Sequence, residues 1–259
     1  MDLIEANRNR RSHARFRWNP EATWALAEWL KQASPRNRER FISMVREGFI
    51  GLDGLYGNLH TGLCRPEELM ENFAEKEHLE RLTDISINSA MISDVPGWNW
   101  GMVTAMVEKG IKYFSSGPNT FDRIGYILKD WGDKPFYWIS PSGKEKVLLY
   151  IHGKGYSWFH TGLNRTANLK NKLKPGRIHR YLRKLEKQNY PYQRIIIRYN
   201  VGSDNGPPDP NLSEIVERWN RQYPQMKISI STTSRAMAKF ESEYGEKIPQ
   251  HQANWSTWC

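Results

Sequence analysis

The chain alternates between short apolar runs and longer segments whose apolar positions follow a helical spacing. Apolar runs of about four to eight residues between turn residues are typical of buried strands, while Ser-Pro and Asn-Pro steps mark helix starts. The predicted strands are residues 15–18, 48–56, 87–92, 112–115, 136–139, 147–152, 195–199 and 227–231. The predicted helices are residues 19–30, 34–45, one that begins at Pro66, 101–109, 177–188, 212–220 and 234–244.

This order of elements predicts an α/β fold with a largely parallel sheet, either a barrel or an open sheet. No G-x-G-x-x-G pattern follows a predicted strand, so a dinucleotide-binding fold is unsupported. In a β/α-barrel the chemistry takes place at the carboxyl ends of the strands. The residues that follow each predicted strand are therefore the first candidates for a functional site.

The length of 259 residues suits one large domain, and we expect a single domain over residues 1–259. No apolar run approaches the roughly 18 residues of a membrane span, so no membrane association is expected. Residues 1–5 do not resemble a signal peptide. With only two cysteines, Cys64 and Cys259, the chain is predicted to be cytoplasmic.

The net charge of +10 raises the question of a nucleic-acid partner. The basic residues are scattered, however, and the run at 170–187 mixes Lys and Arg with His179 and Glu186 on a predicted helix. No zinc-finger spacing or RNA-binding signature is found. We therefore interpret the charge as solvated helix faces and expect no nucleic-acid partner.

Two loops place carboxylates directly after predicted strands. Asp94 follows the strand at 87–92 and lies close in sequence to Trp98. It is a candidate nucleophile or metal ligand, and equally a candidate turn or helix-cap aspartate. Asp204 and Asn205 lie in the polar loop after the strand at 195–199, which could supply a general acid or simply connect to the next helix.

Two further loops carry groups that suit a sugar. Tyr156 follows the strand at 147–152, near two glycines and other aromatic residues, and rings of this kind stack on pyranoses. Asn119 ends the loop after the strand at 112–115 and offers an amide to a polar substrate. His152 and His160 are candidate metal ligands, although a lone histidine is more often a hydrogen-bonded structural residue. The eleven tryptophans suit either a core or a sugar site.

Several blocks match one known family in order along nearly the whole chain. The blocks are Arg17-Trp18-Asn19-Pro20-Glu21-Ala22-Thr23-Trp24, residues 48–63, Pro66-Glu67-Glu68-Leu69, Ser93-Asp94-Val95-Pro96-Gly97, and residues 199–210, 219–220 and 231–233. Together they resemble the N-terminal catalytic domain of glycoside hydrolase family 38, the α-mannosidase group. No single block is specific enough alone, so the resemblance depends on their order.

The resemblance implies a seven-stranded β/α-barrel of the glycoside hydrolase/deacetylase type. It also implies retaining hydrolysis of α-mannosides with one zinc ion, and it places the nucleophile and a zinc ligand on Asp94. A retaining enzyme needs a second carboxyl group roughly 5–5.5 Å away, for which Asp204 is the candidate. We expect Trp98, Asn119, Tyr156 and Asn205 to bind the carbohydrate substrate.

The chain departs from the family pattern at the metal site. Family members begin with a strand that ends in a His-x-Asp pair, whereas Ser12-His13-Ala14-Arg15 has no matching aspartate. The remaining zinc histidine is expected beyond residue 259, so three of four zinc ligands are not found. We therefore expect a domain truncated at both ends, without its first strand and its C-terminal domains. The alternative is a catalytically inactive carbohydrate-binding remnant.

Overall fold

The computed structural model describes all residues except 96, 119–126, 154, 157–174, 200–207 and 254–259. The chain divides into two compact units. The sheet unit comprises Met1, Arg17–Tyr156 and Ser231–Cys259, and the helical unit comprises Asp2–Phe16 and Ser157–Ile230. Each unit is described by itself below.

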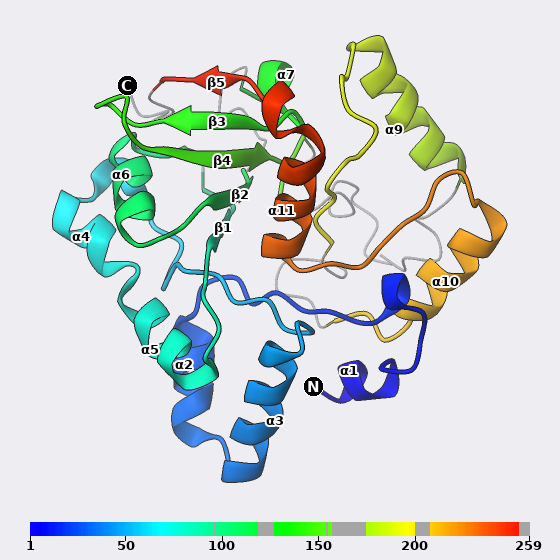
Figure 1. Ribbon diagram of the computed structural model, residues 1–259, viewed down its shortest axis with the longest axis horizontal. Coiled ribbons are helices and arrows are strands. Elements are labelled where there is room, and N and C mark those ends of the chain that lie inside the picture. Colours follow the sequence, from blue (N-terminus) through cyan, green and yellow to red (C-terminus); the bar gives the residue numbers. More distant parts are fainter. Residues whose placement is uncertain (96, 119–126, 154, 157–174, 200–207, 254–259) are drawn as a thin grey trace. The chain divides into compact units, whose positions relative to one another are not determined.

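The sheet unit is built on a five-stranded mixed sheet (Figure 1). The strands, in spatial order, are β1 (Ser89–Ser93), β2 (Tyr113–Gly117), β4 (Lys146–Ile151), β3 (Phe136–Ile139) and β5 (Gln250–His251). The first three are mutually parallel, whereas β3 runs antiparallel to β4 because a tight turn at residues 140–145 joins them. The carboxyl ends of β1, β2 and β4 therefore meet at one edge.

Local sequence signals explain the starts of two helices of the sheet unit. Ser34 caps a helix through its Oγ, which accepts from the backbone N–H of Asn37 at 3.3 Å, as the Ser-Pro step predicts. The N–H of Arg65 donates to Glu68 Oε2 at 2.7 Å and satisfies another helix start. The helices are α2 (Trp24–Gln32), α3 (Pro35–Arg46), α4 (Pro66–Glu71), α5 (Ala74–Thr83), α6 (Gly101–Glu108), α7 (Ile127–Trp131) and α11 (Thr233–Tyr244).

One face of the sheet packs into an aromatic core. Phe114 of β2 stacks on Trp138 of β3, with ring centroids 6.4 Å apart. Trp98 meets Phe114 edge-on at 6.0 Å, and all three side chains are almost fully buried. Aromatic pairs in these geometries stabilise beyond the area that they bury.

The opposite face of the sheet is tied to α11 by Glu241. The hydroxyl of Tyr113 donates to Glu241 Oε2 at 2.8 Å, and that of Tyr137 donates to Oε1 at 2.7 Å. Leu148 of β4 pairs with both tyrosines, so the two hydroxyls lie on the same face of the sheet. Burial, together with the bond to the carboxylate, raises the pKa of both tyrosines.

We expect Glu241→Ala to lower the free energy of unfolding by about 2–3 kcal/mol, because two charge-assisted hydrogen bonds lose their acceptor. Urea denaturation measures the change. Glu243→Ala on the same helix is the control, since it removes the exposed ion pair with Lys239 and should cost less than about 1 kcal/mol. An equal effect of the two variants would contradict the role of Glu241 in holding α11 to the sheet.

The hydrogen bonds of Tyr113 and Tyr137 to Glu241 also predict a loss of stability at alkaline pH. The pKa of Tyr113 and Tyr137 is raised in the folded state above the usual value of 10.0, so the folded state holds these protons more tightly. Their contribution is complete below about pH 10 and declines as the pH rises further. Tyr137→Phe should flatten the fall in the urea midpoint that begins above about pH 10.

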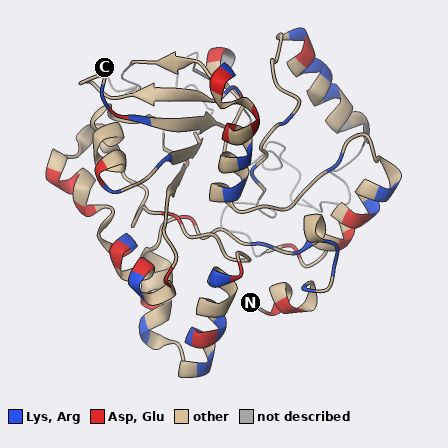
Figure 2. Cartoon of the chain, viewed as in Figure 1, with Lys and Arg blue, Asp and Glu red and all other residues tan. Residues whose placement is uncertain are grey.

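The helical unit is held by α10 (Leu212–Gln222) and contacts from the N-terminal segment, which includes α1 (Asp2–Ala6). Arg10 forms an ion pair with Glu217 of α10 at 2.7 Å, and Ile230 N donates to His13 O at 2.8 Å. The helix α9 (Pro175–Lys187) buries Ile178, Tyr181 and Leu185. It exposes Arg180, Arg183, Lys184 and Lys187. Figure 2 shows Lys and Arg in blue along this helix. The described part of the basic run, residues 175–187, therefore lies on an amphipathic helix, as predicted.

Several predicted elements are wrong. Residues 195–199 and 227–231 form no strand, and Ile197 is partly exposed rather than buried in a sheet. Residues 15–18 and 48–56 contribute only one parallel bridge, between Trp18 and Ile50. Strand propensity is realised only where a neighbouring strand is available to pair with, and the sequence does not give that neighbour. The seven-stranded barrel is therefore not confirmed by the described residues.

The start of α2 also differs from the prediction. The helix begins at Trp24 rather than near Asn19, because Ala22 adopts a left-handed conformation with φ of 56°. The backbone N–H and the hydroxyl of Thr23 both donate to Leu55 O, at 2.9 and 3.1 Å. The segment before α2 is thus held against residues 55–56.

Among the described helices, none has the length and apolar character needed to cross a membrane.

Candidate active site

Asp94 lies immediately after β1, at the edge where the parallel strands end. Its backbone is left-handed, with φ of 61°, a conformation that aspartate tolerates better than most residues. Its N–H donates to the carbonyl oxygen of Gly117, the last residue of β2, at 2.9 Å. The side chain is exposed, so the carboxylate is accessible from solvent.

A second carboxylate lies beside this strand end. The Nδ2 of Asn58 donates to Glu21 Oε1 at 2.8 Å and to the carbonyl oxygen of Ser93 at 3.3 Å. Ser93 directly precedes Asp94. Sequence reasoning interpreted Glu21 as part of a helix start and so missed it. Its position three residues after the end of the predicted strand at 15–18, within the matched block, was the available signal.

The ends of β2 and β4 carry a buried serine–histidine pair. Ser115 Oγ lies 2.9 Å from His152 Nε2, and the backbone N–H of His152 donates to Ser116 O at 2.8 Å. The side chains of Ser115 and His152 are buried. His152 thus makes the kind of side-chain hydrogen bond expected of a structural histidine, and its role as a metal ligand stays a prediction. His160 lies outside the described residues.

The predicted substrate-binding residues fall into three situations. Trp98 is only 1% exposed and packs in the aromatic core, so in this conformation its ring faces the interior. Tyr156 is partly exposed, a few residues after β4. Asn119, Asp204 and Asn205 lie outside the described residues. The site thus brings together Asp94, Asn58 and Glu21, and of these only Asp94 was predicted as a catalytic residue.

Asp209, the other carboxylate of the loop at 200–210, has a structural role in the helical unit. It is buried, accepts a hydrogen bond from the hydroxyl of Tyr199 at 2.7 Å, and accepts another from the N–H of Asn211 at 2.8 Å. Burial, and then the bond to Asp209, raise the pKa of Tyr199. Asp209 therefore fixes the segment that leads into α10.

The described residues do not offer a zinc site. Across the part of the chain that the structure describes, no group of three or more His, Cys, Asp or Glu side chains is placed to hold a metal ion. Zinc in proteins is usually held by at least three such side chains. Asp94 is present as one possible ligand, but a ligand set around it is not.

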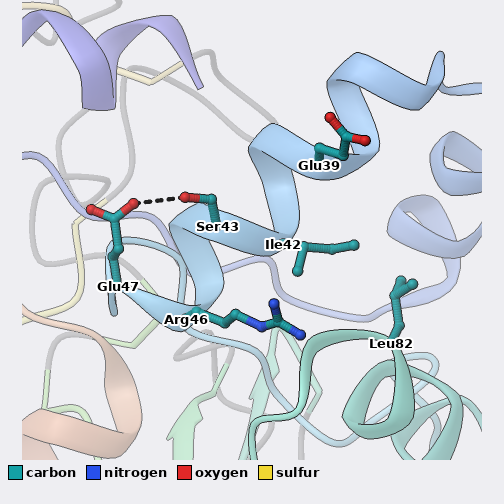
Figure 3. Close-up of a pocket in the computed structure, with 6 residues that line it drawn as sticks. All are labelled: Glu39, Ile42, Ser43, Arg46, Glu47 and Leu82. Atoms are coloured by element: carbon teal, nitrogen blue, oxygen red, sulfur yellow. Dashed lines mark hydrogen bonds between the residues drawn. The ribbon is translucent and has the colours of Figure 1, made fainter.

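A cavity of about 380 Å³ lies on another part of the sheet unit, between α3 and α5 (Figure 3). Inside it Ser43 Oγ donates to Glu47 Oε1 at 2.8 Å, and Arg46 Nε donates to Thr83 O at 2.8 Å. Its lining residues are Glu39, Ile42, Ser43, Arg46, Glu47 and Leu82. None of them follows a strand, so the cavity is not part of the candidate site.

Comparison with known families gives one match over almost the entire chain. The family described as "Glycosyl hydrolases family 38 N-terminal domain" matches residues 2–254. No curated protein sequence matches the chain.

Solved structures share this fold at low sequence identity. An α-mannosidase from Enterococcus faecalis V583 superposes with a TM-score of 0.69 at 14% identity, covering 98% of this chain and 27% of that chain. A glycosyl hydrolase family 38 protein from Enterococcus faecalis gives 0.60 at 12% identity, covering 98% and 25%. A 4-α-glucanotransferase from Thermococcus litoralis gives 0.55 at 14% identity, covering 92% and 33%. The chain therefore spans about a quarter of the length of the two Enterococcus proteins.

Proposed function

Since the chain belongs to the glycosyl hydrolase family 38 N-terminal domain family, we propose that it is the catalytic domain of a retaining glycosidase that acts on α-mannosides. The single observation that carries the proposal is the exposed carboxylate of Asp94 at the carboxyl edge of β1. In barrel-type hydrolases, catalytic groups lie at this edge. The substrate class comes from the family.

The proposed reaction uses two carboxyl groups in two steps. Asp94 attacks the anomeric carbon and forms a covalent glycosyl ester while Asp204, as general acid, protonates the leaving oxygen. Asp204 then takes a proton from water, which attacks the anomeric carbon and releases Asp94. Two inversions give net retention. No motif match fixes the assignment of Asp204, which is proposed as a carboxylate of the polar loop at residues 200–210.

Zinc takes no step in this proposal. The family expectation makes Asp94 a zinc ligand, where the ion would bind and orient sugar hydroxyls. The described residues do not fit this expectation, because no ligand group of three or more is found among them. A single domain over residues 1–259, a cytoplasmic location and further C-terminal domains stay predictions.

The proposal is tested by following hydrolysis of an aryl α-mannoside with proton NMR. We expect the α-anomer of mannose to appear first, with the β-anomer growing only by mutarotation. Aryl β-mannoside and α-glucoside serve as controls and should react at least about tenfold more slowly. Initial release of the β-anomer would overturn the retaining mechanism. The assay is run with added zinc and with a chelator, so that a metal requirement is measured directly.

A second candidate is a carbohydrate-binding remnant without catalysis. The absence of a metal-ligand group from the described residues favours it. This candidate predicts saturable binding of mannosides that is insensitive to chelator, with no release of the aryl group under any of the conditions above. That outcome would replace the catalytic proposal.

A further inference from the structure

The peptide bond that leads into Asp94 is held from both sides. Its carbonyl oxygen, on Ser93, accepts from Asn58 Nδ2 at 3.3 Å. Its N–H, on Asp94, donates to Gly117 O at 2.9 Å. In a trans peptide these two groups point in opposite directions, so one bond on each side fixes the plane of the peptide. We infer that Asn58 and Glu21 are positioning residues for Asp94, an inference that rests on the proposed function.

Glu21 provides a second acceptor that holds the NH₂ group of Asn58 beside Ser93. An amide carries one acceptor oxygen and one donor NH₂ group, and both neighbours of Asn58 are acceptors. A carboxylate and a carbonyl oxygen can both be satisfied only by the NH₂ group, which has two hydrogens to donate. Without Glu21 the NH₂ group keeps only its bond of 3.3 Å to the Ser93 carbonyl oxygen, so the amide is held less firmly in this orientation.

The backbone next to Glu21 and the backbone next to Asn58 are each held by hydrogen bonds. On one side, Thr23 N and Trp24 N donate to Leu55 O and Tyr56 O, at 2.9 and 3.0 Å, just after Glu21. On the other side, Gly57 N donates to Asn72 Oδ1 at 2.9 Å, and Asn72 Nδ2 donates back to Gly57 O at 3.1 Å. The hydrogen bond between Glu21 and Asn58 therefore joins two segments with fixed backbone, and Asn58 connects them to the end of β1.

The orientation of this peptide matters because Asp94 has φ of 61°. A non-glycine residue keeps a left-handed conformation only where its surroundings hold it. If the peptide turns over, the carboxylate of Asp94 leaves its position, and a displacement of about 1 Å can lower a reaction rate about 100-fold. The link thus acts on the nucleophile without touching the substrate.

The test compares variants that keep or remove the acceptor. Glu21→Gln keeps a side-chain oxygen for Asn58 and should stay within about threefold of the wild-type kcat, whereas Glu21→Leu and Asn58→Ala should lower kcat about 10–100-fold. KM should change less than about threefold, since the interaction positions a reacting group rather than binding substrate. Glu28→Leu, an exposed glutamate on α2, is the matched control.

A second measurement does not depend on activity. Amide hydrogen exchange at Asp94 should accelerate at least about tenfold in Asn58→Ala and Glu21→Leu, and should stay near wild type in Glu21→Gln. Unchanged exchange and unchanged kcat in Asn58→Ala would overturn the inference. A loss of kcat in Glu21→Gln equal to that in Glu21→Leu would also overturn it, because the carboxylate would then act by its charge or proton.

The outcomes separate this inference from the proposed function. If Asp94→Asn leaves hydrolysis unchanged, the nucleophile assignment fails, while the exchange data still report whether the link holds the peptide. If Asp94→Asn abolishes hydrolysis and Asn58→Ala leaves kcat and exchange unchanged, only the positioning role fails.

Discussion

Replacement of Asp94 by asparagine is expected to lower the rate of α-mannoside hydrolysis on the order of 10⁴-fold. Asparagine has nearly the same shape as aspartate, but a neutral amide cannot form the glycosyl ester. It also tolerates the left-handed conformation that Asp94 adopts, so the backbone should not change. Since the side chain is exposed, we expect the free energy of unfolding to stay within about 0.5 kcal/mol of wild type.

Asp84→Asn provides a closely matched control. Asp84 is also exposed and left-handed, with φ of 58°, but it ends α5 rather than a strand. Initial rates with an aryl α-mannoside, and mass spectrometry after reaction with an activated fluoromannoside, measure turnover and the covalent ester. We expect Asp84→Asn to match wild type in both. Equal turnover in the two variants would remove Asp94 from the mechanism.

Trp98→Ala is expected to lower the free energy of unfolding by about 3–5 kcal/mol. The indole ring is 1% exposed and packs edge-on against Phe114, so alanine would leave a cavity in the aromatic core. Its Nε1 has no hydrogen-bond partner among the described residues, so the loss of stability comes from lost packing contacts and not from a lost hydrogen bond. For the same reason Trp98→Phe should be milder, at about 1–2 kcal/mol.

Trp24→Ala is the control for this core effect. Trp24 is 53% exposed at the start of α2, and its removal should cost about 1 kcal/mol or less. Urea denaturation followed by far-UV circular dichroism avoids the change in tryptophan fluorescence. A cost for Trp98→Ala no greater than that for Trp24→Ala would mean that Trp98 does not form part of the core.

Local signals in the sequence predicted those elements that depend on a few neighbouring residues. The Ser34-Pro35 step predicted the start of α3, and the apolar run at 136–139 predicted β3. The apolar run at 195–199 has equal strand propensity but forms no strand. The short strand β5 was missed, because its two residues carry no pattern and form a strand only through pairing with β3.

By itself the sequence determined the family and the position of Asp94 at a strand end, since both depend on the order of residues along the chain. Only the tertiary structure decided that Trp98 lies in the core and that Glu21 and Asn58 meet beside Ser93. Glu21 and Asn58 are 37 positions apart, and Asn58 and Ser93 are 35 apart. Contacts over such separations depend on how strands and helices pack, and a residue type does not encode whether its ring will face the core or a ligand.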